Sequence, residues 1–214
     1  DLVIVGVRQV KRWVMPEVPS GLVTLLRQCP VPVWVMYPTG VDRRRVLALI
    51  DPDPHDPVRD GLNDLVLVQA RSFADVESAE LHVGHAWKST GRSRRRSSRE
   101  ARSSDRSGVL PESTRAVHAA QVGALLDRHG LADGGVAVHL VDGAAGEALP
   151  KLAGRIPADL MVVGTVARTG LGRLVAGNTA EAIVRSAHCS VLVLKPEGVP
   201  VPVTPAVHSA GGGR

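Results

Sequence analysis

Residues 162–181 read VVGTVARTGLGRLVAGNTAE and change character twice along their length. They begin as an apolar run, pass through a turn rich in glycine, and end as the polar first turn of a predicted helix. Asn178 or Thr179 is placed to cap this helix, and Glu181 occupies the position that a capping box gives to glutamate. The stretch therefore predicts a β-strand that leads into a helix. Two interpretations stay open: the turn holds a phosphate, or it only connects the two elements.

Strand and helix patterns alternate along most of the chain. Apolar runs typical of strands occur at residues 45–50, 79–87, 136–141, 159–164 and 190–195. Helical stretches separate them, at residues 56–76, 111–130, 144–155 and 178–188. Most of the strands are continuously apolar, which is typical of a parallel sheet covered by helices on both faces. We therefore expect an α/β fold with a doubly wound, five-stranded parallel sheet.

The N-terminal residues repeat the end of this pattern. An offset of 158 residues places residues 1–36 on residues 159–194 without a gap. Under this offset the DL…VG opening at Asp1 matches the one at Asp159, and valines of the following strands match as well. We therefore expect residues 1–37 to be the C-terminal β-α-β remnant of a first domain, whose front end is missing.

The repeat divides the chain into further predicted parts. Residues 38–44 are expected to be a linker, and residues 45–197 a complete domain. The apolar runs at 32–35 and 191–194 would each be an exposed strand edge, so we expect these two strands to meet. A half-complete first domain would leave apolar surface exposed, which predicts aggregation or dimerisation.

The positive charge lies in one segment. The formal net charge is +5, and residues 89–108 carry seven arginines against two acidic residues, so the remainder of the chain is neutral. We expect residues 88–110 to form a basic disordered loop. Residues 198–214 are rich in proline and glycine and are expected to be a disordered tail.

Three interpretations of the basic loop stay open. It is a solvated loop, or it carries a phosphorylation site at Ser97 or Ser98 within the sequence RRRSS, or it is an electrostatic tether for RNA, DNA or anionic lipid. The loop has no aromatic residue on which a base could stack. We therefore expect no specific nucleic-acid partner.

Two segments far apart in the sequence converge in a sheet of this kind. In a doubly wound sheet, ligands bind beyond the carboxyl ends of the strands, where the strand order reverses. For the order 3-2-1-4-5 this crevice lies between Asp51, which follows the first strand, and the glycine-rich turn, which follows the fourth. Glycines let backbone N–H groups approach phosphate oxygens, and the N-terminus of the next helix attracts anions. Asp51 is suited to accept a hydrogen bond from a base or a sugar.

The turn resembles that of a known family. The sequence GTVARTGLGRLVAGNTAE, between DLMVVG and CSVLVLK, is similar to the universal stress protein family, and the repeat resembles its tandem, E-type members. The resemblance implies a five-stranded sheet in the order 3-2-1-4-5, an adenine nucleotide alpha hydrolase-like fold. It further implies pairing with another such domain through the last strand, as a homodimer or in tandem, and a role in stress tolerance.

The ATP-binding members of that family carry G-x2-G-x9-G-[S/T] at this turn, and the match is partial. Gly164 and Gly177 occupy the first and last glycine positions, Ala167 replaces the middle glycine, and Asn178 replaces the hydroxyl residue, with Thr179 following. The resemblance further implies that the base and ribose are lined by Ile50, Asp51, Leu81, Val163 and Gly164. The implied ligand is ATP or AMP, without a metal other than nucleotide-associated Mg²⁺.

The first copy departs further from this pattern. Gln9, Pro19 and Ser20 occupy the places of the second glycine, the last glycine and the hydroxyl residue. Proline has no N–H group to donate to a phosphate. We therefore expect that this copy binds no nucleotide in the same way.

Other chemistry is not favoured by the sequence. Cys29 and Cys189 lie in no metal-binding spacing, and His82 and His85, three apart on one strand, should point to opposite faces of the sheet. No arrangement typical of a catalytic site is present, so we expect no enzyme, with a slow ATPase as the exception left open. No apolar run approaches the ~20 residues of a membrane span, and the two thiols favour a cytoplasmic protein.

These observations predict a stress-response regulatory protein with an adenine-nucleotide site. The alternative is a nucleotide-independent interaction module of the same family, which acts through strand edges or interdomain surfaces.

Overall fold

The computed structural model describes residues 1–7, 20–37, 44–88, 111–165 and 178–196. The tail predicted at 198–214 lies outside the described residues, and so do Ser97, Ser98, Ala167 and Gly177. The predicted linker and the predicted basic loop lie outside them too, apart from Arg44 and Lys88 at their ends.

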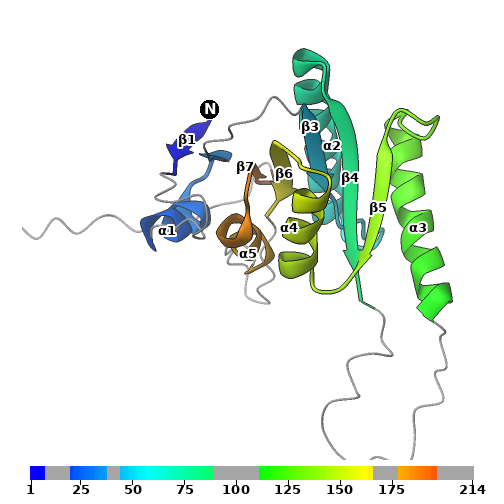
Figure 1. Ribbon diagram of the computed structural model, residues 1–214. Helices are drawn as coiled ribbons and strands as arrows, with labels where there is room; N and C mark the ends of the chain where they lie inside the picture. Colours follow the sequence, from blue (N-terminus) through cyan, green and yellow to red (C-terminus); the bar gives the residue numbers. More distant parts are fainter. Residues whose placement is uncertain (8–19, 38–43, 89–110, 166–177, 197–214) are drawn as a thin grey trace, which may run out of the picture.

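One sheet runs through the described part of the chain (Figure 1). Its strands are β1 (Val3–Gly6), β2 (Val33–Met36), β3 (Arg45–Leu49), β4 (Glu80–Trp87), β5 (Ala137–Asp142), β6 (Leu160–Gly164) and β7 (Ser190–Leu194). Its helices are α1 (Ser20–Gln28), α2 (Pro57–Glu77), α3 (Pro111–Arg128), α4 (Ala145–Arg155) and α5 (Asn178–Ser186). The predicted alternation of strand and helix is therefore confirmed.

The strand order confirms the predicted winding and corrects the number of strands. From β3 to β7 the order is β5-β4-β3-β6-β7, which is 3-2-1-4-5, and all of these neighbours are parallel. The sheet does not stop there, however, because it has seven strands. The edge of β7 pairs with β2 in antiparallel orientation, and β1 follows β2. An apolar strand edge is satisfied by a further strand, so the N-terminal segment extends the sheet.

The segments β1-α1-β2 and β6-α5-β7 have the same geometry. Both strand pairs are parallel, and Val3 pairs with Val33 just as Met161 pairs with Val191, which is the register that the 158-residue offset requires. Helices α1 and α5 also span equivalent residues. Across the junction Trp34 pairs with Leu192, its own equivalent. The segments are therefore related by a local twofold axis between these two residues, while the assignment of residues 1–37 to a first domain stays a prediction.

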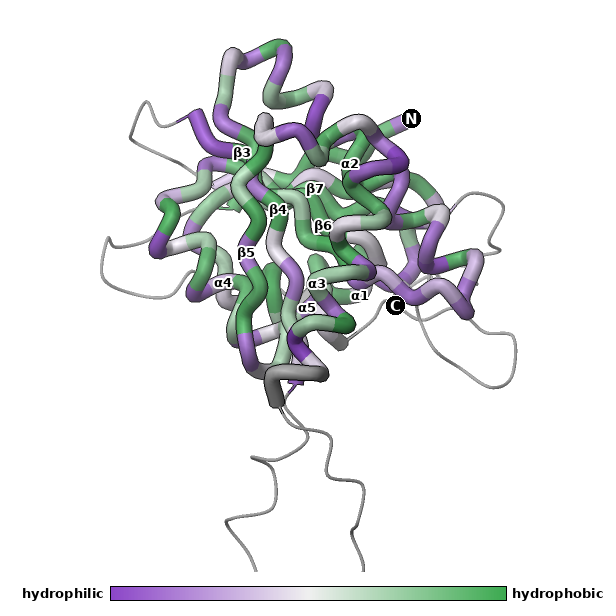
Figure 2. The backbone as a smooth tube through the Cα atoms, turned by 90° about the vertical axis from the view of Figure 1, so that its right-hand side faces the viewer, coloured by the Kyte–Doolittle hydropathy of each residue, from purple (hydrophilic) through white to green (hydrophobic). Residues whose placement is uncertain are grey.

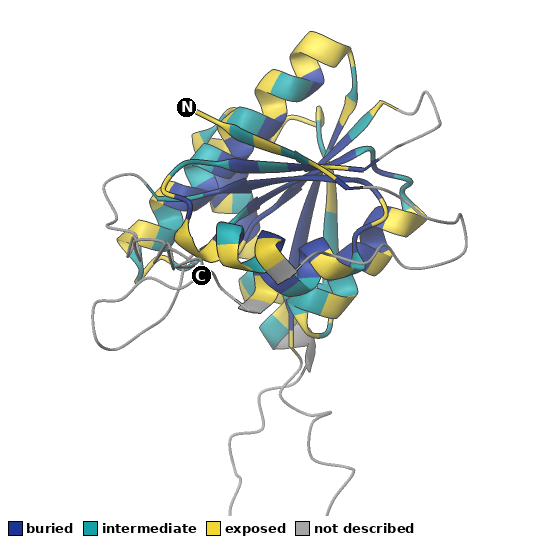
Figure 3. Cartoon of the chain, turned by 90° about the vertical axis from the view of Figure 1, so that its left-hand side faces the viewer, coloured by how far each residue is buried: buried dark blue, intermediate teal, exposed yellow. Residues whose placement is uncertain are grey.

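Helices cover the two faces of the sheet unequally. One buried cluster joins α1, α4 and α5 to the sheet, and a second joins α2 and α3 to the opposite face. Figure 3 shows the buried strands between these helical layers, and Figure 2 shows hydrophobic residues along the central strands β6 and β7. The continuous apolar runs in the sequence are explained by this arrangement, because both faces of the central strands are buried.

The face of the sheet that carries α2 is covered over β6 and β7 and is open over β1. Leu160 and Val162 are buried there, with 7% and 0% of their surface exposed, while their equivalents Leu2 and Ile4 expose 45% and 57%. Trp34 receives partial cover from the edge of Phe73 on α2, with ring centroids 5.2 Å apart. No helix equivalent to α2 covers the described residues of β1, which explains the difference.

No described helix is both long enough and apolar enough to span a membrane.

Candidate functional site

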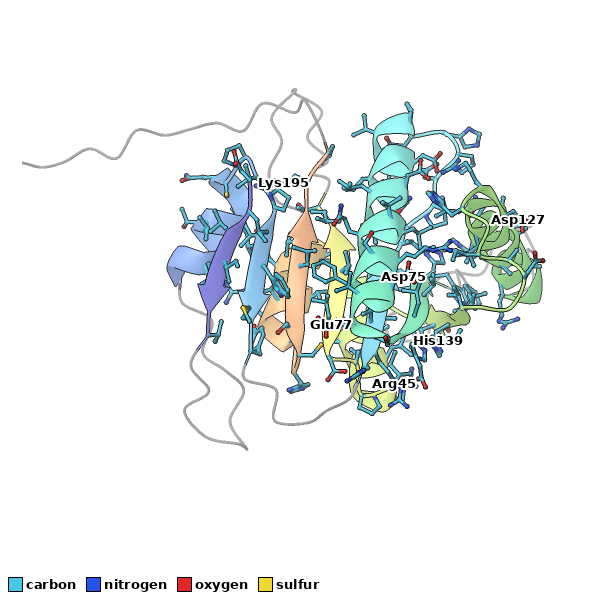
Figure 4. The ribbon with its side chains drawn as sticks, turned by 90° about the horizontal axis from the view of Figure 1, so that it is seen from above. Arg45, Asp75, Glu77, Asp127, His139 and Lys195 are labelled. Carbon is cyan, nitrogen blue, oxygen red and sulfur yellow. The ribbon has the colours of Figure 1, made fainter. Side chains whose placement is uncertain are left out.

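The carboxyl ends of β3 and β6 lie side by side. Leu49 is the register partner of Val163 in this parallel pair, so Ile50 and Asp51 emerge from the sheet beside Gly164. In Figure 4, Lys195, which follows β7, marks the carboxyl edge of the sheet, and Arg45 marks the amino edge. The structure therefore brings together the end of β3 and the start of the glycine-rich turn, although Ile50 and Gly164 are 114 positions apart in the sequence.

Hydrogen bonds fix the backbone at Ile50 and Asp51. The Ile50 N–H donates to the Gly84 carbonyl oxygen at 3.0 Å. The Asp51 N–H donates to Asn63 Oδ1 at 2.9 Å, and Asn63 Nδ2 donates back to the Asp51 carbonyl oxygen at 3.1 Å. Asn63 is buried on α2. Asn63 was not predicted from the sequence, although an amide among the apolar residues of a helix face indicates a buried hydrogen-bond partner.

The Asp51 carboxylate already has a partner. Arg59 Nη1 donates to Asp51 Oδ2 at 3.0 Å, and the Arg59 side chain, 13% exposed, also lies 3.4 Å from Asp53 and 3.7 Å from Asp56. Asp56 caps α2 by accepting from the Arg59 N–H at 3.1 Å. The Asp51 side chain is 67% exposed, and a carboxylate has further lone pairs, so it can accept a ligand donor as well.

Gly164 is required for packing. A β-carbon at this position would lie 2.6 Å from Cγ and Cδ2 of Leu62 on α2. Val163 and Ile50, predicted to line a pocket, are buried in the two core clusters instead. The glycine at the start of the turn therefore has a structural reason that is independent of any phosphate.

Leu81, which the resemblance assigns to the base and ribose pocket, lies away from this edge in the register of the sheet. It pairs with Val46 near the amino end of β3, whereas Gly84 is the residue of β4 that bonds to Ile50. With about 3.3 Å per strand residue, Leu81 lies on the order of 10 Å or more from the carboxyl edge. The part of β4 that reaches the site is the segment from Gly84 to Trp87.

Two helix N-termini meet at the same edge. Helix α5 begins at Asn178, and Thr179 is exposed in its first turn. A β-carbon at Gly146, in the first turn of α4, would lie 2.7 Å from the Ala182 β-carbon and 3.9 Å from the Thr179 carbonyl oxygen. This close contact places the first turns of α4 and α5 together, and their unpaired N–H groups favour an anion.

Glu181 in the first turn of α5 binds an arginine of the N-terminal segment. Both of its carboxylate oxygens accept from Arg27 on α1, at 2.5 and 2.9 Å. The sequence predicts a capping-box role for Glu181 and does not reveal this ion pair, because the two residues are 154 positions apart and only the β2–β7 junction brings them together.

The histidines of β4 point to opposite faces, as predicted. His82 contacts His139 of β5, with Nδ1 and Nε2 3.0 Å apart, and His85 contacts His118 of α3 on the other face. Among the described residues there is no group of three or more side chains that could hold a metal ion.

Comparison with known sequences identifies relatives over most of the chain. A family model described as "Universal stress protein family" matches residues 44–195. Universal stress protein E of Escherichia coli K12 is 30% identical over 184 residues, which are 84% of this chain and 55% of that protein. A universal stress protein E homolog of Haemophilus influenzae is 28% identical over 80% of this chain and 54% of its own length. The chain spans about half the length of these curated relatives.

Solved structures agree with this relationship. The crystal structure of a functionally unknown protein from Pseudomonas aeruginosa PAO1 has a TM-score of 0.70 and 26% identity, over 92% of this chain and 64% of that one. A universal stress protein from Archaeoglobus fulgidus has a TM-score of 0.62 at 18% identity, over 91% of this chain and 62% of that one, and shares the fold. The matched sequence, the strand order and the E-type relatives lead to one conclusion: the chain belongs to the universal stress protein family.

Proposed function

We propose that this protein binds an adenine nucleotide, ATP or AMP, at the carboxyl edge of the sheet between β3 and β6, and acts as a regulatory binding protein in a stress response. The observation that supports this proposal is the parallel register of β3 and β6, which sets Asp51 beside the start of the glycine-rich turn. The first turns of α4 and α5 lie at the same edge, where they favour the negative charge of phosphates.

The described residues suit the two ends of such a ligand differently. The exposed Asp51 carboxylate accepts from the amino group of the base or from a ribose hydroxyl, while Asn63 holds the backbone of Asp51 in place. At the other end, the Thr179 hydroxyl and the N–H groups of α5 are donors for phosphate oxygens. Asn178, Ala167 and Gly177 belong to the proposed phosphate side by their place in the sequence. Any Mg²⁺ would arrive with the nucleotide.

Titration of the 214-residue chain with ATP and AMP, by isothermal calorimetry up to millimolar concentration, tests the proposal. We expect saturable binding, and a loss of about tenfold or more in affinity for Asp51→Asn, because a charged acceptor contributes about 1.5–3 kcal/mol. Asp53→Asn is the matched control, since Asp53 shares Arg59 with Asp51, and we expect its affinity to stay within about threefold. Absence of binding by the folded wild-type chain would refute the proposal. We expect no turnover of labelled ATP in the same samples.

The Arg27–Glu181 pair gives a second prediction for this site. Glu181 lies in the first turn of α5, so its charge repels phosphate unless Arg27 neutralises it. We expect Arg27→Gln to weaken ATP binding by about fivefold, because the charge of Glu181 is then uncompensated and repels the phosphates. The double variant Arg27→Gln/Glu181→Gln should recover most of the affinity.

Arg185→Gln is the control for that experiment. Arg185 is the equivalent of Arg27 in the repeat and lies in the last turn of α5, away from the proposed phosphates. Its replacement should leave the affinity within about twofold, and the effect of Arg27→Gln should shrink between 50 and 500 mM NaCl as the charges are screened. Equal weakening by both arginine variants, or no recovery in the double variant, would contradict the role of Arg27.

A second candidate function is a nucleotide-independent interaction module. The observation that favours it is the apolar surface of Leu2 and Ile4 beside the free edge of β1. Pairing of another domain with β7 would compete with β2, which already occupies that edge in this chain. Analytical ultracentrifugation with and without ATP separates the two functions: self-association that Ile4→Ser abolishes and ATP leaves unchanged supports the second. For either function we propose a cytoplasmic location.

A further inference from the structure

A pair of histidines lies directly behind the Asp51 side of the proposed site. His85, near the carboxyl end of β4, is 1% exposed, and its Nδ1 lies 3.0 Å from the Ile50 carbonyl oxygen. Its Nε2 lies 2.9 Å from Nδ1 of His118 on α3. The two rings are tilted against each other with centroids 4.9 Å apart, and the Trp87 ring lies 6.1 Å from that of His118. These contacts link the end of β3, the end of β4 and helix α3.

The hydrogen-bonding partners determine where the protons of the neutral pair lie. A carbonyl oxygen only accepts, so His85 Nδ1 carries a hydrogen and donates it to Ile50. Nε2 of neutral His85 is then an acceptor, and His118 Nδ1 must be the donor to it. The neutral pair therefore forms one directed chain, from His118 through His85 to the backbone immediately before Asp51.

The charged groups around His85 come from several elements. Asp51 follows β3 and is paired with Arg59 of α2, His118 faces His85 from α3, and Asp142 ends β5 opposite Trp87. One added proton can be placed on His118 Nε2, and it leaves the hydrogen bond from His118 Nδ1 to His85 Nε2 intact. A second proton, on His85 Nε2, leaves no acceptor between the two rings. The N–H groups of His85 Nε2 and His118 Nδ1 then face each other across 2.9 Å, so the rings must separate.

We propose that His85 and His118 are positioning residues, which hold the Ile50–Asp51 backbone in its binding geometry while they are neutral and release it when both are protonated. The binding consequence rests on the proposed nucleotide function: affinity falls once the pH is low enough to protonate both rings. The structural consequence does not rest on that function, because the Asp51 backbone should change its environment at the same pH with or without a ligand.

The direction of the stability change follows from burial. Burial lowers the pKa of His85 from 6.5, although the hydrogen bond to Ile50 and the charge of Asp51 oppose the shift. The unfolded chain therefore binds a proton to this residue more readily than the folded chain does. The contribution of neutral His85 to stability is complete above about pH 6.5 and decreases as the pH falls toward the lowered pKa of the folded state.

The sharpest test compares the wild-type chain with His118→Asn. The Asn side-chain amide can take the place of His118 Nδ1–H as a donor to His85, but it does not titrate. Nitrogen-15 correlation spectra of the imidazoles at pH 7.5 should show both rings protonated at Nδ1. As the pH is lowered, the Asp51 amide resonance should then move in the wild-type chain when both rings become protonated, and it should stay within about a few hundredths of a ppm in His118→Asn over the same range.

Nucleotide binding supplies the second measurement. ATP affinity should fall about tenfold in the wild-type chain between pH 7.5 and the pH at which the Asp51 resonance has moved, and about threefold or less over the same range in His118→Asn. A His85 ring protonated at Nε2 at neutral pH, or an Asp51 resonance that moves equally in both chains, overturns the proposal. If no nucleotide binds at any pH, the proposed function fails, and the resonance measurement still decides the role of the histidines.

Discussion

Leu160→Ala should lower the free energy of unfolding by about 2–5 kcal/mol, whereas Leu2→Ala should lower it by less than about 1 kcal/mol. The two leucines are equivalent under the internal repeat and differ in what covers them. Leu160 lies on β6 beneath α2, while Leu2 precedes β1, where no described helix covers that face. Truncation of Leu160 removes buried methyl groups and leaves a cavity, and truncation of Leu2 removes surface that is already partly in water.

Urea denaturation at pH 7.5, with the midpoint and slope fitted for each variant, measures both changes. Val33→Ala and Val191→Ala form a second equivalent pair, in which both valines are fully buried, so these two losses should be similar. A loss for Leu2→Ala as large as that for Leu160→Ala would contradict the picture, because it would require a cover over β1. The comparison thus measures the effect of α2 with the side chain held constant.

Gly164→Ala should destabilise the fold by about 1–3 kcal/mol, because the added methyl group overpacks a filled core. Its β-carbon would lie 2.6 Å from two atoms of Leu62, a buried residue of α2. Both atoms belong to a side chain, so Leu62→Ala in the same chain should relieve part of the clash. The loss for the double variant should therefore be smaller than the sum of the two single losses.

The repeat supplies the control for this variant too. Gly6 is the equivalent of Gly164 in β1, and a β-carbon there meets nothing within 4 Å. Gly6→Ala should therefore change the stability by less than about 0.5 kcal/mol. If Gly164→Ala were as harmless as Gly6→Ala, the glycine would have no packing role.

The sequence was sufficient for the order of the elements. Continuous apolar runs indicated strands that are buried on both faces of the sheet, and Asp56 and Pro57 indicated the start of α2. The 158-residue offset predicted two equivalent β-α-β units. The sequence was not sufficient to place Leu81 relative to the site. Either end of the eight-residue strand β4 could lie there, and only the register of β4 with β3 decides which end does.

The contacts that shape the site depend on pairs distant in the sequence. Local sequence patterns do not predict that Glu181 pairs with Arg27 or that Leu62 packs against Gly164. They also do not predict that His118 is hydrogen-bonded to His85. A buried polar residue such as Asn63 can be noticed in a helix pattern, but its partner at Asp51 cannot.

The sequence by itself determined the α/β class and the internal repeat, because periodicity and turn chemistry are local properties of a chain, while the strand order from β3 to β7 was implied by the family resemblance. The meeting of β2 and β7 was predicted from their apolar edges, but only the tertiary structure decided their antiparallel register, the packing role of Gly164 and the neutralisation of Glu181 by Arg27. Register and burial depend on which surfaces meet, and a strand pattern allows several partners until the edge of β7 selects one.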